Sequence, residues 1–216
     1  MSRILSVDPY DPDPESVGEI VAVLKAEGTV ALPTDTVYGL SADIFSRVAV
    51  ERLLTLKGRP SGKPIPIFIS SIEALGGVVR QISGPAQRLA EEFWPGPLTL
   101  IFHASPHVPD GITAGTGTVG VRVPKLPLIG AILTSLDSSI SGTSANRSGG
   151  GNPVTVRDVV SELGHDCDLI VDGGEASGGV PSTVLDCTQF PFRLVREGAV
   201  GRGVLAAVLG RDGLLT

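Results

Sequence analysis

Residues 13–33 read DPESVGEIVAVLKAEGTVALP, and this stretch predicts one helix followed directly by one buried strand. Asp13 is a favourable helix-capping residue, and Pro14 is tolerated in the first turn, where its missing amide hydrogen is not needed. Apolar residues then recur at helical spacing until Gly28, at Val17, Ile20, Val21 and Leu24. Residues 29–33 form a short apolar run that is typical of a buried strand.

The rest of the chain repeats this alternation. Further strands are expected at residues 65–69, 98–102, 118–123, 139–142, 169–171, 183–187 and 193–196. Further helices are expected at residues 46–57, 83–94, 126–136, 155–163 and 204–209. Alternation of this kind, with antiparallel strands near the end, predicts an α/β fold with one mixed, twisted sheet and flanking helices. No linker-like composition divides the chain, so we expect residues 1–216 to form a single domain.

Composition excludes several classes of protein. Apolar residues make up 42% of the chain and charged residues 19%, which is not a disordered or fibrous composition. No apolar run approaches the length of a membrane span, and the N-terminal residues lack the apolar stretch of a secretory signal, so we expect no membrane association and a cytoplasmic location. A formal net charge of -6 argues against a protein that coats nucleic acid through bulk electrostatics.

Cysteine and histidine give no sign of a metal centre or a disulfide framework. Cys167 and Cys187 form no CxxC pair, and we expect both to be buried as small apolar residues. The three histidines show no metal-ligand spacing, so no protein metal site is predicted. No Ser/His/Asp or Cys/His set emerges from the spacing either, which argues against a covalent nucleophile.

The segment KGRPSGK, residues 57–63, concentrates three cations in an otherwise acidic chain. Because it follows a predicted helix, it fits a solvated C-terminal cap with Gly58 in the left-handed conformation. It fits a phosphate clamp equally well, with Lys57 as a point charge and Arg59 as a planar fork. The residues alone leave both readings open.

Other polar, glycine- and proline-rich segments also fall at predicted strand ends, where loops of an α/β sheet converge. They are PTDTVYGL (33–40), TVGVRVP (118–124), GTSANRSGGGN (142–152), GVPSTV (179–184) and LVREGAV (194–200). Residues 143–152 fit either an ordinary turn or a cradle of amide and hydroxyl groups around a ligand. Arg122, inside an apolar run, requires either a structural salt bridge or a ligand. Neither a GxxxxGK[ST] nor a GxGxxG pattern is present.

Taken together, these segments resemble the YrdC-like family of threonylcarbamoyl-adenylate synthases. The matching motifs are PTDTVYGL, KGRP, FWPGPLT, TVGVRVP, TSANRSG, PSTV and RLVREGAV, in that order from Pro33 to Val200. The resemblance implies a twisted α/β fold with a deep cationic cleft. It further implies condensation of L-threonine, bicarbonate or CO2, and ATP into threonylcarbamoyl-adenylate with release of pyrophosphate. A transferase complex then moves the threonylcarbamoyl group to tRNA, to which this chain is expected to bind at most weakly.

The resemblance also implies roles for individual residues. Catalytic charge neutralisation is expected of Lys57 and Arg59. The expected ATP contacts are Lys57, Arg59, Lys63, Thr118, Ser144, Asn146, Asn152 and Arg196. The expected L-threonine contacts are Thr36, Phe68, Arg122, Gly142 and Ser182. Mg²⁺ is expected to be held mainly by the ATP phosphates and water, because no carboxylate cluster marks a protein cage.

Two positions depart from the family pattern. Phe68 occupies a place where members often have a histidine, and Gly142-Thr143 replaces the commoner Ala-Pro. Two alternative functions therefore stay open: a related enzyme acting on another amine or carbamoyl substrate, and an RNA-binding module without catalysis. With aromatic residues at 4% and none in residues 57–63, the chain offers few stacking platforms for the second.

Overall fold

The computed structural model describes residues 3–58, 62–164, 166–210 and 213–215. Its helices are α1 (Pro14–Lys25), α2 (Arg47–Lys57), α3 (Leu75–Val78), α4 (Gly84–Phe93), α5 (Asp110–Thr113), α6 (Pro127–Leu136), α7 (Val156–Leu163) and α8 (Arg202–Leu209). Among the described residues, no helix is both long enough and apolar enough to cross a membrane. The short helices α3 and α5 are additions to the elements that the sequence predicts.

The predicted caps of the first two long helices are confirmed. The Asp13 carboxylate accepts a hydrogen bond from the Ser16 amide at 2.8 Å, and Pro14 occupies the first turn of α1. Ser46 caps α2, and Gly58 follows its last residue in the left-handed conformation, with φ of 55°. Local sequence signals thus fix where these helices begin and end, because capping depends on residues that are close in the chain.

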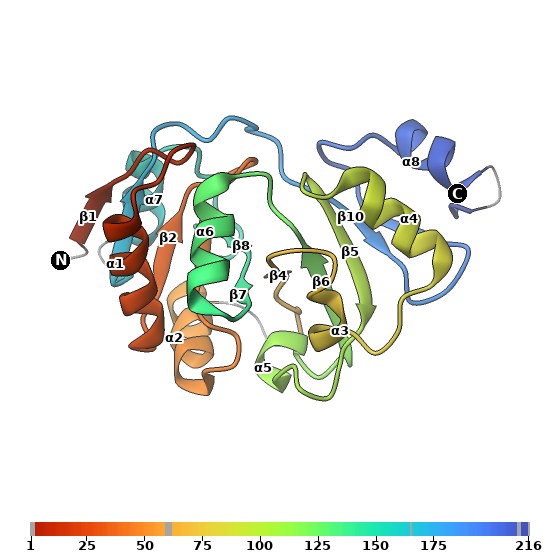
Figure 1. Ribbon diagram of the computed structural model, residues 1–216, viewed down its shortest axis with the longest axis horizontal. Helices are drawn as coiled ribbons and strands as arrows, with labels where there is room; N and C mark the ends of the chain where they lie inside the picture. The colour runs from red at the N-terminus through yellow and green to blue at the C-terminus, as the bar shows by residue number, and fades with distance from the viewer. Residues whose placement is uncertain (1–2, 59–61, 165, 211–212, 216) are drawn as a thin grey trace.

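Five strands form a first sheet in the order β1-β9-β2-β3-β8. Their bounds are β1 (Arg3–Ser6), β2 (Val30–Leu32), β3 (Gly39–Ser41), β8 (Thr143–Ser144) and β9 (Leu169–Asp172). β9 runs parallel to β1 and β2, whereas β3 pairs antiparallel with β2 and β8. In Figure 1 this sheet lies on the left, with α1 in front of it and α7 behind.

Six strands form a second sheet in the order β11-β10-β5-β6-β4-β7. Their bounds are β4 (Ile67–Phe68), β5 (Leu98–His103), β6 (Thr118–Arg122), β7 (Ile140–Ser141), β10 (Thr183–Asp186) and β11 (Arg193–Arg196). Parallel pairs, β4 with β6 and β5 with β10, alternate with antiparallel ones. The predicted α/β class and mixed strand directions are confirmed, but the prediction of one sheet is wrong, because the strands divide between two.

The inner strands β2 and β9 of the first sheet are covered on both faces, which explains their uninterrupted apolar residues. Val30 and Leu32 on β2 belong to a core shared with α1 and α6. Ala31, between them, points to the opposite face and joins the larger core that includes Val159 of α7. α6 packs beside α1, as Figure 1 also shows. Phe68 of the second sheet belongs to the same hydrophobic cluster. This packing brings the two sheets together.

The chain passes from one sheet to the other over a single residue, Gly142. Ser141 ends β7 in the second sheet, and Thr143 begins β8 in the first. The Gly142 amide donates to the Pro66 carbonyl at 2.7 Å, which fixes the crossing point beside β4. The sequence predicts one strand over residues 139–142, because strand partners, which differ between Ser141 and Thr143, cannot be read from a local pattern.

Candidate active site

A cavity of about 180 Å³ lies between the two sheets, next to this crossing point. The residues that line it are Thr34, Thr36, Val37, Tyr38, Gly39, Pro66, Phe68, Thr99, Arg122, Gly142, Thr143, Ser144, Asn152, Pro181, Ser182 and Arg196. Most carry hydroxyl, amide or guanidinium groups, and the chain segments that supply them are far apart in sequence. The predicted convergence is confirmed for residues 33–40, 118–124, 142–152, 179–184 and 194–200, whereas the described residues of 57–63 do not line the cavity.

Five neighbouring strands of the second sheet each bring one side chain to this cavity. Phe68 and Arg122 end the parallel strands β4 and β6, and Thr99 lies at the start of β5. Ser182 precedes β10, and Arg196 ends β11. Strands lie about 4.8 Å apart, so the row from β4 to β11 extends over roughly 19 Å of sheet edge. Arg122 and Arg196 lie three strands apart in this row, and in addition to burial the charge of Arg196 contributes to lowering the pKa of Arg122.

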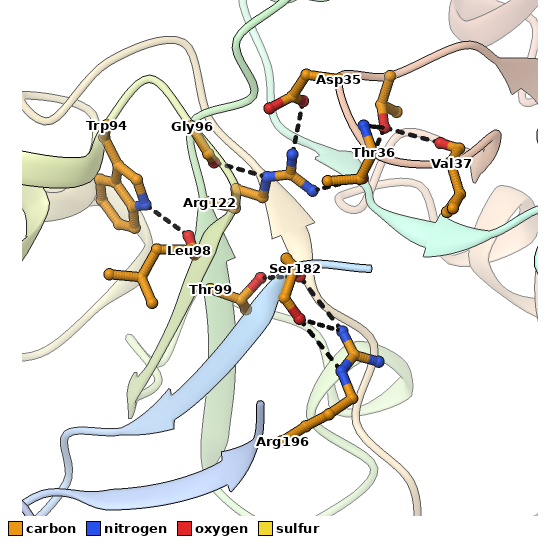
Figure 2. Close-up of polar contacts among 11 residues, drawn as sticks. Asp35, Thr36, Val37, Trp94, Gly96, Leu98, Thr99, Arg122, Ser182 and Arg196 are labelled. Carbon is orange, nitrogen blue, oxygen red and sulfur yellow. Dashed lines mark hydrogen bonds and ion pairs between the residues drawn. The ribbon is translucent and has the colours of Figure 1, made fainter. Parts of the chain in front are cut away.

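Arg122 is held by three protein groups (Figure 2). Its Nε donates to the Gly96 carbonyl at 2.9 Å, Nη1 to Thr36 Oγ1 at 3.0 Å, and Nη2 to Asp35 Oδ1 at 2.6 Å. Burial lowers the pKa of Arg122, while the charge of Asp35 opposes that shift. A guanidinium has five N–H donors, so two are left for a ligand beyond these three bonds. Arg122 thus has a structural salt bridge and retains ligand-binding capacity.

Two threonines beside Arg122 form a short chain of hydroxyl groups. Thr34 Oγ1 donates to the Val37 carbonyl at 2.7 Å and lies 3.0 Å from Thr36 Oγ1. Because the single hydroxyl proton of Thr34 goes to the Val37 carbonyl, Thr36 Oγ1 donates its own proton to Thr34 Oγ1. One lone pair of Thr36 Oγ1 accepts a hydrogen bond from Arg122. The other lone pair can accept one more hydrogen bond, and no proton remains to be donated. Its geometry therefore suits a ligand group that donates, such as an amine.

At the other end, Arg196 is fastened to Ser182. Its Nη2 and Nε donate to the Ser182 carbonyl at 2.7 and 3.2 Å, as Figure 2 shows. Ser182 Oγ lies 2.9 Å from Thr99 Oγ1, which ties the start of β10 to β5. Burial lowers the pKa of Arg196. Among the described residues, no carboxylate forms an ion pair with Arg196, so its charge is available to an anionic ligand.

Lys57 decides between the two readings of residues 57–63. The side chain is buried, and Nζ donates to the carbonyls of Ser144 and Asn146 at 2.5 and 2.8 Å. Ser144 Oγ in turn donates to Asn146 Oδ1 at 2.5 Å. The residue is therefore not a solvated cap, although Gly58 does end the helix as predicted. Lys57 brings positive charge beneath the loop that carries Ser144 and Asn146.

Phe68 and Gly142, the two departures from the family pattern, are in contact. A Cβ atom on residue 142 would lie 2.3 Å from Phe68 Cε1, closer than two carbon atoms can approach. The Phe68 ring centroid is 5.7 Å from Arg122 Cζ, so the ring also borders the guanidinium. The ring forms an apolar part of the wall in a cavity lined mainly by polar groups.

The remaining predicted site residues are placed less centrally. Arg59 lies outside the described residues. Asn152 is exposed at the rim of the cavity, and Lys63 is exposed beyond it. Thr118, Lys57 and Asn146 do not line the cavity; Thr118 begins β6, at the opposite end of the strand from Arg122.

Sequence reasoning missed Asp35, Thr34, Tyr38 and Thr99. The Asp35 carboxylate pairs with Arg122, which lies far away in the chain. Its position directly before Thr36 in the TDTVYGL segment was the available signal. The Tyr38 hydroxyl donates to the Gly174 carbonyl at 2.7 Å, which ties this segment to the loop after β9. The buried positions predicted for Cys167 and Cys187 are confirmed.

Comparison with known proteins agrees with this geometry. A threonylcarbamoyl-AMP synthase of Pyrococcus abyssi is 40% identical over 181 residues, covering 84% of this chain and 53% of the relative. One from Bacillus subtilis is 37% identical over 199 residues, covering 92% and 57%. The chain thus spans little more than half the length of these two relatives. A putative threonylcarbamoyl-AMP synthase of Mycobacterium tuberculosis is 35% identical, with 95% of each chain covered.

Solved structures give the same result. The crystal structure of P. abyssi Sua5 complexed with L-threonine matches with a TM-score of 0.94 and 34% identity, covering 99% of this chain and 63% of that one. Escherichia coli YciO matches with a TM-score of 0.84 and 27% identity, covering 92% and 97%. The Sua5/YciO/YrdC family, described as "Telomere recombination", matches residues 22–198, so the chain belongs to this family.

Proposed function

We propose that this chain is an L-threonylcarbamoyladenylate synthase, which condenses L-threonine, bicarbonate or CO2, and ATP into threonylcarbamoyl-AMP and pyrophosphate. One observation carries the proposal. Arg122 and the Thr36 hydroxyl face a small cavity, in a fold nearly identical to that of a relative solved with L-threonine. This chain spans 63% of the length of that relative.

The amino-acid end of the site is the cavity itself. About 180 Å³ suits a small metabolite and is below the 300–1,000 Å³ typical of larger ligands. The two remaining N–H groups of Arg122 bind the threonine carboxylate, and Thr36 Oγ1 accepts from its amine. Ser182 and the backbone at Gly142 complete the contacts with threonine.

The nucleotide end extends outward along the row of strand ends towards Arg196. ATP contacts Ser144, Asn152 and Arg196 at the rim, and the loop braced by Lys57 through Asn146 supports it. Arg59, Lys63 and Thr118 complete the proposed set of ATP contacts. In this proposal, the cationic cleft that the family resemblance implies is formed by Lys57, Arg59, Lys63 and Arg196.

The chemistry needs alignment and charge neutralisation more than a protein nucleophile. The threonine amine, after losing a proton, attacks the carbon of CO2, and a second proton leaves as the carbamate forms. When bicarbonate is the carbon source, this second proton leaves together with the hydroxide of bicarbonate as one water molecule. A carbamate oxygen then bonds to the α-phosphorus of ATP, and the bond from that phosphorus to pyrophosphate breaks. Arg122 holds the threonine carboxylate throughout, while Lys57 and Arg59 offset negative charge on the triphosphate.

Mg²⁺ is proposed to enter with ATP. Across the part of the chain that is described, no group of three or more His, Cys, Asp or Glu side chains could hold a metal ion. Asp35, the carboxylate nearest Arg122, already receives a hydrogen bond from it. Phosphate oxygens and water therefore supply the ligands, as Mg²⁺ commonly accepts. When bound, the ion neutralises phosphate charge.

The direct test is pyrophosphate release with ATP, bicarbonate and L-threonine, omitting each substrate in turn. Release should require all three. Arg59→Ala should lower turnover by roughly 100-fold or more, the usual effect of losing one charge-assisted contact in a closed site. Arg88→Ala, which changes an exposed arginine of α4, should leave turnover unchanged and serves as the control. Normal turnover by Arg59→Ala would remove the clamp from the mechanism.

The same experiment separates the alternatives. Release that does not depend on threonine would favour an enzyme for another amine, the alternative that Phe68 supports by removing a polar group from the wall. No release, together with salt-sensitive RNA binding, would favour an RNA-binding module. For the synthase, we propose a cytoplasmic location, weak direct tRNA binding at most, and delivery of the product to a tRNA-modifying transferase complex.

A further inference from the structure

The Phe68 ring occupies the space that any side chain on residue 142 would need. An added Cβ would lie 2.3 Å from Cε1 and 2.6 Å from both Cδ1 and Cζ of the ring. Contacts this short are with three ring carbons at once, so a small rotation of the ring cannot relieve them all. As long as residue 68 is phenylalanine in this position, residue 142 has to be glycine.

Neither partner has room to move away. Gly142 sits between β7 and β8, and its amide is bonded to the Pro66 carbonyl at 2.7 Å. A Cβ added to Gly39 on β3 would lie 3.9 Å from Phe68 Cε2, in ordinary van der Waals contact, so the ring also lies next to this strand. The ring is 3% exposed, and its remaining free surface borders the cavity.

The apolar part of the cavity wall at Phe68 meets the polar part at Arg122, whose Cζ is 5.7 Å from the ring centroid. Thr36 and Arg122 form a hydrogen-bonded pair, and Thr99 and Ser182 form another. Phe68 offers only carbon atoms, and neither Gly142 nor Gly39 beside it carries a side chain. A hydroxyl placed against the ring would lose its hydrogen bonds to water without replacement, whereas a methyl group would gain contact.

We propose that Phe68 is a specificity-determining residue, whose ring contacts the methyl group of the bound amino acid and so selects threonine over serine. This inference rests on the proposed function and goes beyond it by naming the group that is read and the residue that reads it. Recognition of one methyl group in an apolar pocket typically gives about 10- to 200-fold discrimination. Threonine should exceed serine by a factor in this range.

Removing the ring should change the preferred substrate. Phe68→Ala leaves a vacant space between Gly142 and Gly39 that opens into the cavity. We expect the threonine-to-serine ratio of kcat/KM to fall to within a few-fold of one. We also expect β-phenylserine, whose aryl group can fill the vacated space, to become a substrate. Phe68→Leu keeps apolar bulk at the wall and should retain most of the preference, which provides a folded variant even if the alanine variant is unstable.

The pairing with Gly142 gives a second, independent measurement. Gly142→Ala should abolish amino-acid binding, because the new Cβ collides with the Phe68 ring. Isothermal titration calorimetry measures this loss. The double variant Phe68→Ala with Gly142→Ala should recover binding of serine and threonine. Gly130→Ala on α6 is the matched control, since a Cβ there meets nothing within 4 Å, and it should bind threonine normally.

The outcomes distinguish the two proposals. Threonine-dependent release by the unmodified protein, with an unchanged threonine-to-serine ratio in Phe68→Ala or in the double variant Phe68→Ala with Gly142→Ala, would overturn the role of Phe68 and leave the proposed function intact. No threonine-dependent release by the unmodified protein would overturn both. Loss of preference in Phe68→Ala, with gain of β-phenylserine activity, would support the assignment.

Discussion

The guanidinium of Arg122 lies 2.6 Å from the Asp35 carboxylate, and this ion pair joins the second sheet to the loop between β2 and β3. Their side chains are 4% and 11% exposed, so neither charge is well solvated. Asp35→Asn leaves the arginine buried with no opposite charge, which typically costs about 3–5 kcal/mol. We expect a lower free energy of unfolding in urea and a higher KM for threonine.

An exposed ion pair provides the control for that substitution. Arg147 and Asp166 are 2.8 Å apart, with side chains 54% and 61% exposed. Asp166→Asn should change the free energy of unfolding by no more than about 1 kcal/mol, because water screens exposed pairs. Equal losses for the two variants would contradict a special role for Asp35.

Replacing Lys57 should affect both stability and nucleotide use. Lys57→Met keeps the aliphatic stem but leaves the carbonyls of Ser144 and Asn146 without their donor. The expected loss is about 1–3 kcal/mol in the free energy of unfolding, together with a higher KM for ATP. Lys25→Met, at an exposed position near the end of α1, should change neither quantity. A higher KM for threonine alone would show that the loop serves the other substrate.

Arg196→Lys tests the forked contact with Ser182. Lysine has a single ammonium group and cannot reproduce the bonds that Nε and Nη2 make to the Ser182 carbonyl. We expect the KM for ATP to rise roughly tenfold, the equivalent of one charge-assisted hydrogen bond, while binding of threonine in calorimetry is little changed. Arg193→Lys, on the same strand with a side chain 66% exposed, should behave as the unmodified protein.

Tyr38 should make stability depend on pH in the alkaline range. Burial raises the pKa of its hydroxyl from 10.0 to about 12, so the folded protein retains the proton that the unfolded chain loses first. The stability it contributes is complete below pH 10 and is lost as the pH rises from about 10 to about 12. Tyr38→Phe should flatten this part of the stability profile, measured by urea unfolding at each pH. Tyr10→Phe, at a residue 62% exposed, should leave the profile unchanged.

Much of the fold follows from local sequence signals. Asp13, Ser46 and Gly58 set helix ends because each acts on backbone groups within a few residues. The division into two sheets does not follow in this way. β7 and β8 have two residues each and differ only in their partners. β1 was not predicted either, since it is an edge strand with a largely exposed pattern.

The site was predictable as a collection of segments, not as a network. The family resemblance implied roles for Thr36, Arg122, Ser182 and Arg196, and all four line one cavity. The bond between Arg122 and Asp35 joins residues that are 87 positions apart, and spacing carries no information about such pairs. The contact between Phe68 and Gly142 likewise became evident only in three dimensions, where two separate departures from the family pattern form one interlocking pair.

The single-residue crossing at Gly142 has a mechanical consequence. The two sheets are also held together beside this point, because the Ser141 amide donates to the Ala42 carbonyl at 2.9 Å and Arg122 pairs with Asp35. Phe68, on β4, lies beside the crossing, whereas Arg196 lies on β11 at the far edge of its sheet. A substitution that disturbs the crossing would therefore distort the amino-acid end of the cavity before it reaches the nucleotide end.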